Sequence, residues 1–219
     1  MFRERQPRSD VASAYGRMGT MSRPSKRAER RLDILEAARG VAVREGAGGT
    51  TLRAIATAAG MEPSAVLYYF DGLGEIVEEL VFLASDRFID TITRAVGAVE
   101  SPTDRMLAAI RAGATGGIEG HESRILYEFW AAGIRDERLN DADHALDRRQ
   151  VAIYRRIIQD GVAAGVFEPR LDHGEAAVAL VALEDGLVMD ILAGTKSSDE
   201  VVAIIVSVAE AMLGAPLRA

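Results

Sequence analysis

Apolar residues recur at intervals of three and four along most of the chain, a spacing that places them on one face of a helix. The first such stripe follows Ser25, a residue that can cap a helix, and ends at the glycine-rich segment 46–49. Its members are Ile34, Leu35, Ala38, Val41 and Ala42. The pattern predicts a first helix with one buried side.

The segment 50–70, TTLRAIATAAGMEPSAVLYYF, predicts two short helices separated by a tight turn. Thr50 can cap the first of them by accepting a hydrogen bond from a free backbone N–H. Gly60 suits the left-handed residue that ends a helix, and Pro63 can occupy the first turn of the next one. The buried stripe of the first helix comprises Leu52, Ile55, Ala56 and Ala59. This arrangement is typical of a helix-turn-helix, whose second helix can enter the major groove of DNA.

Longer helices are predicted after residue 72. The helix expected over 175–192 is apolar almost all the way round and must be covered on more than one side, and the last helix also carries a long apolar stripe. Two terminal helices that need several partners predict a homodimer joined through a four-helix bundle. The predicted ranges are 73–99, 103–112, 122–134, 139–164, 175–192 and 198–213. The sequence thus predicts an all-α protein with an N-terminal three-helix helix-turn-helix domain and a larger helical bundle that dimerises through its last two helices.

Charge is unevenly distributed along the chain. The net charge is −7, yet residues 1–31 contain nine basic and three acidic side chains and carry +6, which leaves −13 for the remainder. A basic arm beside a helix-turn-helix can release counterions from the DNA backbone. We expect a disordered basic arm over residues 1–22, a DNA-binding domain over 23–72, and an effector-binding and dimerisation domain over 73–219. Within the arm, either Met18 or Met21 can serve as the start.

The composition excludes several kinds of chemistry. The chain has no cysteine, so it contains no disulfide, no thiolate metal site and no thiol nucleophile, which fits a reducing cytoplasm. Residues 1–22 contain no apolar run of signal-peptide length, and no uninterrupted apolar run is long enough to span a bilayer. We therefore expect a soluble cytoplasmic protein.

No motif predicts catalysis, a metal or a cofactor. The histidines His121, His144 and His173 lie far apart and form no His-x-x-x-His or Glu-x-x-His pair. The glycine-rich segment 113–120 lacks the Lys-Ser/Thr ending of a phosphate-binding loop and a preceding strand, so we expect a flexible connection between helices. No serine lies in a nucleophile-elbow motif. The chain is therefore not expected to be an enzyme, although an all-α enzyme built on buried carboxylates is one alternative.

Residues 26–80 resemble the DNA-binding domain of the TetR family of transcriptional repressors. A looser resemblance to C-terminal domains of several TetR subfamilies covers segments between Tyr127 and Gly186. The resemblance implies a repressor that an effector releases from a palindromic DNA operator. The N-terminal features that carry it, in the order of the family, are Ile34, Leu35, Ala38, Gly46, Thr50-Thr51, Ile55-Ala56, Ala59-Gly60 and Tyr68-Tyr69-Phe70.

Three positions depart from the family pattern. Leu67 replaces a tyrosine, Leu73 replaces a lysine, and Glu62 occupies a turn position where serine is frequent. The replaced tyrosine and lysine commonly contact DNA phosphates in the family. These departures support a second alternative, a helical small-molecule-binding or adaptor protein that does not bind DNA.

The DNA-contacting residues are expected in three groups. Hydroxyl and cationic side chains can bond to phosphate, and apolar groups can contact thymine methyls. The candidates are Arg23, Lys26 and Arg27 before and in the first helix, Thr50, Thr51 and Arg53 in the second, and Ser64, Ala65, Leu67, Tyr68 and Tyr69 in the recognition helix.

Glu184, Asp185 and Asp190 interrupt the apolar pattern of the penultimate helix, and a charge facing a dry core needs a partner. One interpretation is pairing with solvent or a partner subunit. The other is a cationic or amine ligand held by Asp185 or Glu128 against aromatic faces. The candidate effector-binding residues, whose apolar members can equally be plain core, are Met106, Ile110, Tyr127, Glu128, Trp130, Tyr154, Asp185 and Met189.

Overall fold

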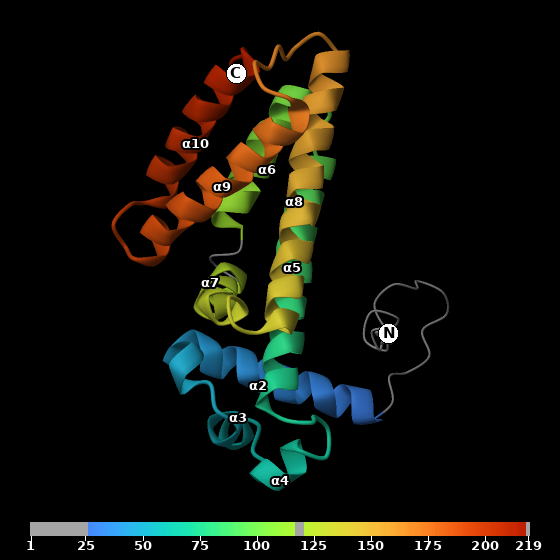
Figure 1. Cartoon of the computed structure of the whole chain (residues 1–219), viewed down its shortest axis with the longest axis vertical. Coiled ribbons are helices and arrows are strands. Elements are labelled where there is room, and N and C mark those ends of the chain that lie inside the picture. Colours follow the sequence, from blue (N-terminus) through green and yellow to red (C-terminus); the bar gives the residue numbers. More distant parts are fainter. Residues whose placement is uncertain (1–25, 117–120, 218–219) are drawn as a thin grey trace, which may run out of the picture.

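The computed structural model describes residues 26–116 and 121–217, which form nine α-helices and no strand. The molecule is elongated: α2, α3 and α4 lie at one end, α9 and α10 lie at the other, and α5 and α8 run along its length (Figure 1). The helices are α2 (Lys26–Gly49), α3 (Leu52–Ala58), α4 (Pro63–Val66), α5 (Leu73–Gly97), α6 (Pro102–Thr115), α7 (Glu122–Gly133), α8 (Glu137–Ala163), α9 (His173–Leu192) and α10 (Ser198–Leu213). The predicted all-α fold is confirmed.

The junction between α2 and α3 corrects the predicted cap. Thr51, not Thr50, is the N-cap of α3, and its side chain accepts a hydrogen bond from the Ala54 N–H at 3.1 Å. Thr50 is buried, and its hydroxyl donates to the Gly46 carbonyl at 2.8 Å. The cap moves by one residue because α2 continues past a break at Gly46 (φ 69°) as far as Gly49.

The turn between α3 and α4 follows the prediction closely. Gly60 has a φ of +65°, the left-handed conformation expected at the end of a helix, and Pro63 begins α4. The second helix is shorter than expected, since α4 ends at Val66 and the next residues form a turn. Tyr68 and Tyr69 therefore lie just after the recognition helix.

The later helices match their predicted ranges to within a few residues, and α10 has the predicted bounds. It begins with a capping box in which Ser197 and Glu200 bond to each other's backbone N–H groups. The main difference is α6, which extends through Gly113 to Thr115. The missing side chain of Gly113 leaves room for the Glu184 carboxylate, whose oxygens would lie 2.7 Å from a Cβ at that position. Residues 117–120 of the expected connection lie outside the described residues.

Two clusters of buried apolar side chains stabilise the fold. The first joins α5, α6, α8, α9 and α10, and the second joins α2, α3, α4 and the beginning of α5. Helix α7 contributes Ile125 and Phe129 to the second cluster although it lies well beyond that region in the sequence. Helix α7 therefore packs against α2, the helix that precedes the helix-turn-helix. No helix among the described residues is long and apolar enough to cross a membrane.

Candidate DNA-binding face and ligand cavity

Tyr68 is the most exposed large hydrophobic side chain of the helix-turn-helix, with 69% of its surface accessible. Arg27 of α2 lies over its ring at 5.4 Å and donates to its backbone carbonyl at 3.4 Å. The ring of Tyr69 packs edge-on against that of Tyr68 with the centroids 5.1 Å apart. These contacts hold an aromatic side chain outward at the tip of the molecule.

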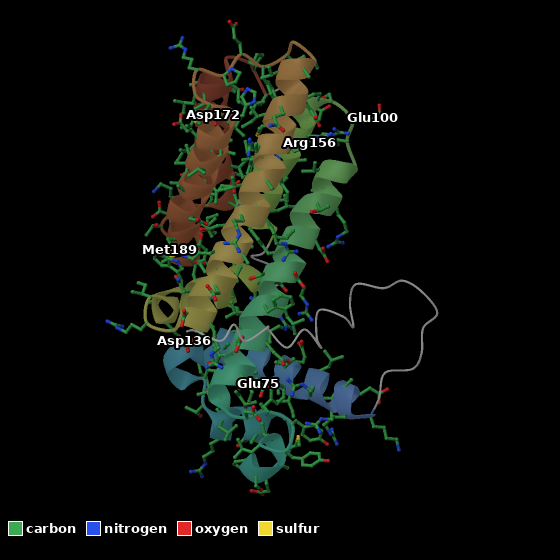
Figure 2. All side chains as sticks on the ribbon, turned by 45° about the vertical axis from the view of Figure 1, so that its right-hand side comes forward. Glu75, Glu100, Asp136, Arg156, Asp172 and Met189 are labelled. Atoms are coloured by element: carbon green, nitrogen blue, oxygen red, sulfur yellow. The ribbon has the colours of Figure 1, made fainter. Side chains whose placement is uncertain are left out.

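Arg31 supports this face from inside. It donates to the Tyr69 carbonyl, pairs with Glu79 and, at 2.9 Å, with Glu75, and lies 4.0 Å from the centre of the Phe70 ring. Burial opposes the charged form of Arg31, but the hydrogen bonds and charges of the two glutamates outweigh it and raise the pKa of the guanidinium. The contacts of Arg31 therefore stabilise the turn after α4. Figure 2 shows Glu75 in this part of the molecule.

The structure brings most of the predicted DNA-binding residues to one end of the molecule. Lys26, Arg27, Thr51, Arg53 and Ser64 are exposed, and Ala65 and Tyr69 are partly exposed. A surface hollow beside α3 is lined by Arg44, Thr51, Arg53 and Thr57, among others.

Three of the remaining predictions on this face need comment. Thr50 does not present its side chain on this face, because it is buried and its hydroxyl donates to the Gly46 carbonyl. Arg23 lies outside the described residues. Leu67 is 48% exposed, so it presents an apolar side chain on the same surface. Arg44 was missed by the sequence analysis, since only its place beside α3 distinguishes it from other exposed arginines.

A cavity of about 600 Å³ lies among α7, α8 and α9. Tyr127 and Trp130 of α7 line it, together with Met189 of α9, which Figure 2 shows at the end of that helix nearest α7. Its polar lining includes the acidic residues Asp143, Asp147, Glu184 and Asp185, together with Gln150, His144, Asn140 and Ser123. The volume falls within the range of small-molecule sites.

Glu184 forms the innermost polar wall of the cavity. It is 1% exposed, accepts a hydrogen bond from Gln150 Nε2 at 2.7 Å, and accepts another from the Tyr154 hydroxyl. Burial raises the pKa of Glu184 to about 8, and the neighbouring Asp185 adds to the shift. Glu184 is therefore mostly protonated at neutral pH and contributes little negative charge.

Asp185 lies at the open side of the cavity, where the Tyr127 hydroxyl is 3.2 Å from its Oδ1. Partial burial raises the pKa of Asp185 to about 6, and the like charges of Asp147 and Asp143 act in the same direction. Burial also raises the pKa values of Asp143 and Asp147, with Asp147 adding to the shift of Asp143. Above pH 6 the cavity therefore concentrates negative charge.

Four of the predicted effector-binding residues line this cavity: Tyr127, Trp130, Asp185 and Met189. Met106 and Ile110 are fully buried core residues, and Tyr154 is also buried, behind Glu184. Glu128 is turned away from the cavity and bonds to the backbone of α2 instead. Met106, Ile110, Tyr154 and Glu128 therefore do not line this cavity.

Asp143 and Asp147 were missed by the sequence analysis. They lie four residues apart on α8 and so share a face, but nothing in the sequence distinguishes that face from a solvated one.

Among the described residues, no group of three or more histidine, aspartate or glutamate side chains is arranged to hold a metal ion.

Models of two protein families match the chain. One, of bacterial regulatory proteins of the tetR family, matches residues 34–80, and the other, the C-terminal region of BetI-type transcriptional repressors, matches residues 91–214. The chain is 26% identical over 149 residues to the HTH-type transcriptional repressor KstR2 of Mycolicibacterium smegmatis, which covers 68% of this chain and 73% of that protein.

Solved structures share the fold at low sequence identity. A TetR transcription regulator from Haloarcula marismortui superposes with a TM-score of 0.76 at 20% identity, over 84% of this chain and 98% of that one. A transcriptional regulator from Saccharomonospora viridis, solved in complex with choline, has a TM-score of 0.74 at 23% identity, over 81% of this chain and 93% of that one.

Proposed function

Because the chain belongs to the TetR family of bacterial transcriptional regulators, we propose that it represses transcription as a homodimer on a palindromic operator and is released by a small-molecule effector. DNA-binding regulation is the function of the family. The operator symmetry, the dimer interface and the effector are the parts that we infer.

The DNA contacts are proposed on the face formed by α3, α4 and the turn after α4. Thr51, Arg53 and the hollow beside them provide hydroxyl and cationic groups for phosphate, while Ser64, Tyr68 and Tyr69 face the groove. The observation that carries this assignment is the exposed ring of Tyr68, held outward by Arg27. Lys26 and Arg27 supply further phosphate contacts from the start of α2.

The homodimer is proposed to form through α9 and α10. Val178 is 54% exposed on α9, and Ile204 and Val208 are each 38% exposed on α10. Burying such side chains against a second copy is favourable, and a two-fold axis would present one reading helix to each half of a palindrome.

The effector is proposed to be an organic cation bound in the cavity among α7, α8 and α9. Asp143, Asp147 and Asp185 supply negative charge, and Trp130 and Tyr127 supply aromatic faces that favour a cation. The arrangement suits an organic cation better than a metal, since the described residues form no metal-binding group. The choline held by the Saccharomonospora viridis regulator shows that a relative of this fold can take up such a ligand.

DNA binding is tested with duplex DNA from the region upstream of the protein's own gene, with random duplex as competitor. The proposal predicts selective binding that protects a palindrome and weakens steeply with salt. A folded dimer that binds neither duplex would support the alternative of a small-molecule-binding protein without DNA affinity, for which exposed Leu67 and Glu62 on the reading face are the motivating observation.

The effector class is tested separately by calorimetry on the free protein. Choline is compared with its neutral carbon analogue, dimethylbutanol, which has a similar shape and no charge. Binding of choline but not of dimethylbutanol supports the proposal. Equal binding of the two compounds contradicts the role assigned to Asp143, Asp147 and Asp185. Asp143, Asp147 and Asp185 are proposed to bind the ligand without changing it. Chemical turnover of a bound ligand by the wild type, lost in Asp185→Asn, would therefore favour the enzyme alternative.

A further inference from the structure

Helix α7 lies between the DNA-binding end and the helical bundle (Figure 1), and it contacts both through different faces. Tyr127 and Trp130 line the cavity, whereas Ile125 and Phe129 are buried in the same apolar cluster as the helix-turn-helix. Any change in the position of α7 caused by a ligand therefore reaches α2 directly.

Glu128 makes the polar contact between α7 and α2. Its Oε2 accepts a hydrogen bond from the Ala47 N–H at 3.0 Å. Gly46, with φ 69° and ψ −175°, interrupts the helix immediately before Ala47, so this N–H lies at the start of a new helical turn, where backbone donors need an external acceptor. The Glu128 carboxylate serves as that acceptor from a distant part of the chain.

Gly46 is fitted closely to this carboxylate. A Cβ at Gly46 would lie 2.8 Å from Glu128 Oε2, and the positive φ is strained for any other residue. The carboxylate therefore sits directly on the peptide at the break in α2. A side chain at residue 46 would displace it.

The break in α2 is linked to the reading helices by Thr50. The Gly46 carbonyl accepts hydrogen bonds from the Thr50 N–H at 3.1 Å and from the Thr50 hydroxyl at 2.8 Å. The next residue, Thr51, caps α3. A short chain of hydrogen bonds thus connects Glu128 to the first turn of the helix-turn-helix.

We propose that Glu128 is a positioning residue that couples occupancy of the cavity to the orientation of α3 and α4, through its contact with Gly46 and Ala47. The inference rests on the proposed DNA-binding and effector-binding functions. Coupling between two sites is reciprocal, so operator binding must also alter the cavity face of α7.

Trp130 makes this reciprocity measurable because it is the single tryptophan of the chain and lines the cavity. Operator duplex is added to the protein, its binding is followed by anisotropy of the labelled duplex, and Trp130 is followed by acrylamide quenching. We expect operator binding to change the quenching constant of the wild type by about twofold, since coupled sites share one conformational equilibrium.

Three variants distinguish the hydrogen bond between Glu128 and Ala47 from the general effect of removing a negative charge near α2. Glu128→Ala removes the acceptor, and Glu128→Gln retains one. Glu36→Ala is the matched control, because Glu36 is an exposed carboxylate of α2, outside the hollow beside α3, that accepts hydrogen bonds from Arg39. Glu128→Ala should still bind DNA but lose most of the Trp130 response, while Glu128→Gln and Glu36→Ala should keep it. A full response in Glu128→Ala, or none in a wild type that binds operator, would overturn the proposal.

A second measurement needs no DNA, so it separates this proposal from the DNA-binding function itself. Gly46→Ala displaces the carboxylate from the α2 side, far from Trp130 in the sequence. In the free protein it should change Trp130 quenching clearly more in the wild-type background than in the Glu128→Ala background, where only the backbone strain at residue 46 remains, with circular dichroism confirming that each variant folds. Equal effects in both backgrounds would overturn the proposal, since the signal would then bypass Glu128.

Discussion

The DNA-binding face and the cavity hold their charged groups in opposite ways. On the face, Arg27 and Arg31 are engaged with backbone carbonyls and aromatic rings, and Arg31 is also paired with Glu75 and Glu79. In the cavity, Asp143, Asp147 and Asp185 form no ion pair within 4 Å with a lysine or arginine among the described residues.

This difference indicates what each region requires from its ligand. The face is already organised by its internal contacts and can meet DNA with little rearrangement. Burial, together with the like charges of Asp147 and Asp143, raises the pKa of Asp185 in the cavity, so a bound cation would offset a repulsion present in the free protein. We therefore expect DNA binding and ligand binding to respond differently to salt, pH and mutation.

Salt should produce the largest contrast. Operator affinity should fall by roughly 10³-fold between about 50 and 200 mM salt if the dimer makes six or more phosphate contacts, because bound cations release counterions from DNA. Choline binding in the cavity should weaken only severalfold over the same range, since a partly enclosed charge pair is screened less. Equal salt slopes for the two ligands, measured by anisotropy and calorimetry, would remove the distinction between the regions.

Aromatic substitutions should separate the regions more locally. Tyr68→Ala should weaken operator binding by about a hundredfold through lost groove and phosphate contacts, and leave choline binding unchanged. Trp130→Ala is the matched control, an exposed aromatic of the cavity that should weaken choline binding and leave operator affinity within a few fold. Unchanged operator affinity in Tyr68→Ala would refute the role assigned to that side chain.

Glu184 predicts a pH dependence of stability. Its pKa is raised from 4.5 to about 8 in the folded state, so the folded protein binds its proton more tightly than the unfolded chain. This contribution is fully present below about pH 4.5 and is lost as the pH rises through 8. Glu184→Gln cannot titrate, so between pH 5 and pH 9 the wild type should lose roughly 4 kcal/mol relative to the variant. Urea denaturation at several pH values measures this difference, and a wild type that gains stability relative to the variant would contradict it.

Asp185 predicts a smaller effect on ligand binding. Asp185→Asn should weaken choline binding by about tenfold at pH 7.5, equivalent to about 1.4 kcal/mol, without changing operator affinity. In the wild type, choline affinity should fall as the pH drops through about 6, because Asp185 becomes protonated, and this fall should be reduced in the variant. Calorimetry at pH 5.5 and 7.5 compares them, with Asp143, Asp147 and His144 as the other titratable groups on the facing helix.

The sequence predicted the reading end far better than the cavity. Local signals define the helix-turn-helix, since Gly60 and Pro63 fix the turn and apolar spacing fixes the buried side. Even there, the cap was displaced from Thr50 to Thr51, because α2 continues past the break at Gly46 as far as Gly49.

The cavity is formed by residues that come together only after the bundle packs. Trp130 and Asp185 were predicted from residue type, but Asp143 and Asp147 were not, because a charged helix face that lines a cavity has the same pattern as one in water. Glu128 shows the reverse error: an acidic residue adjacent to the cavity residue Tyr127 faces away from the cavity and contacts α2. Side-chain direction on α7 decides both outcomes.

Release of operator DNA by a cation tests the account most directly. The preformed complex between the protein and its upstream duplex is titrated with choline or dimethylbutanol while anisotropy reports bound DNA and Trp130 fluorescence reports the cavity. The account predicts that choline changes Trp130 fluorescence and dissociates the DNA over the same concentration range, and that the neutral analogue does neither. A complex that stays intact while Trp130 shows a saturated cavity would contradict the account, because a ligand that binds both states equally cannot shift the equilibrium between them.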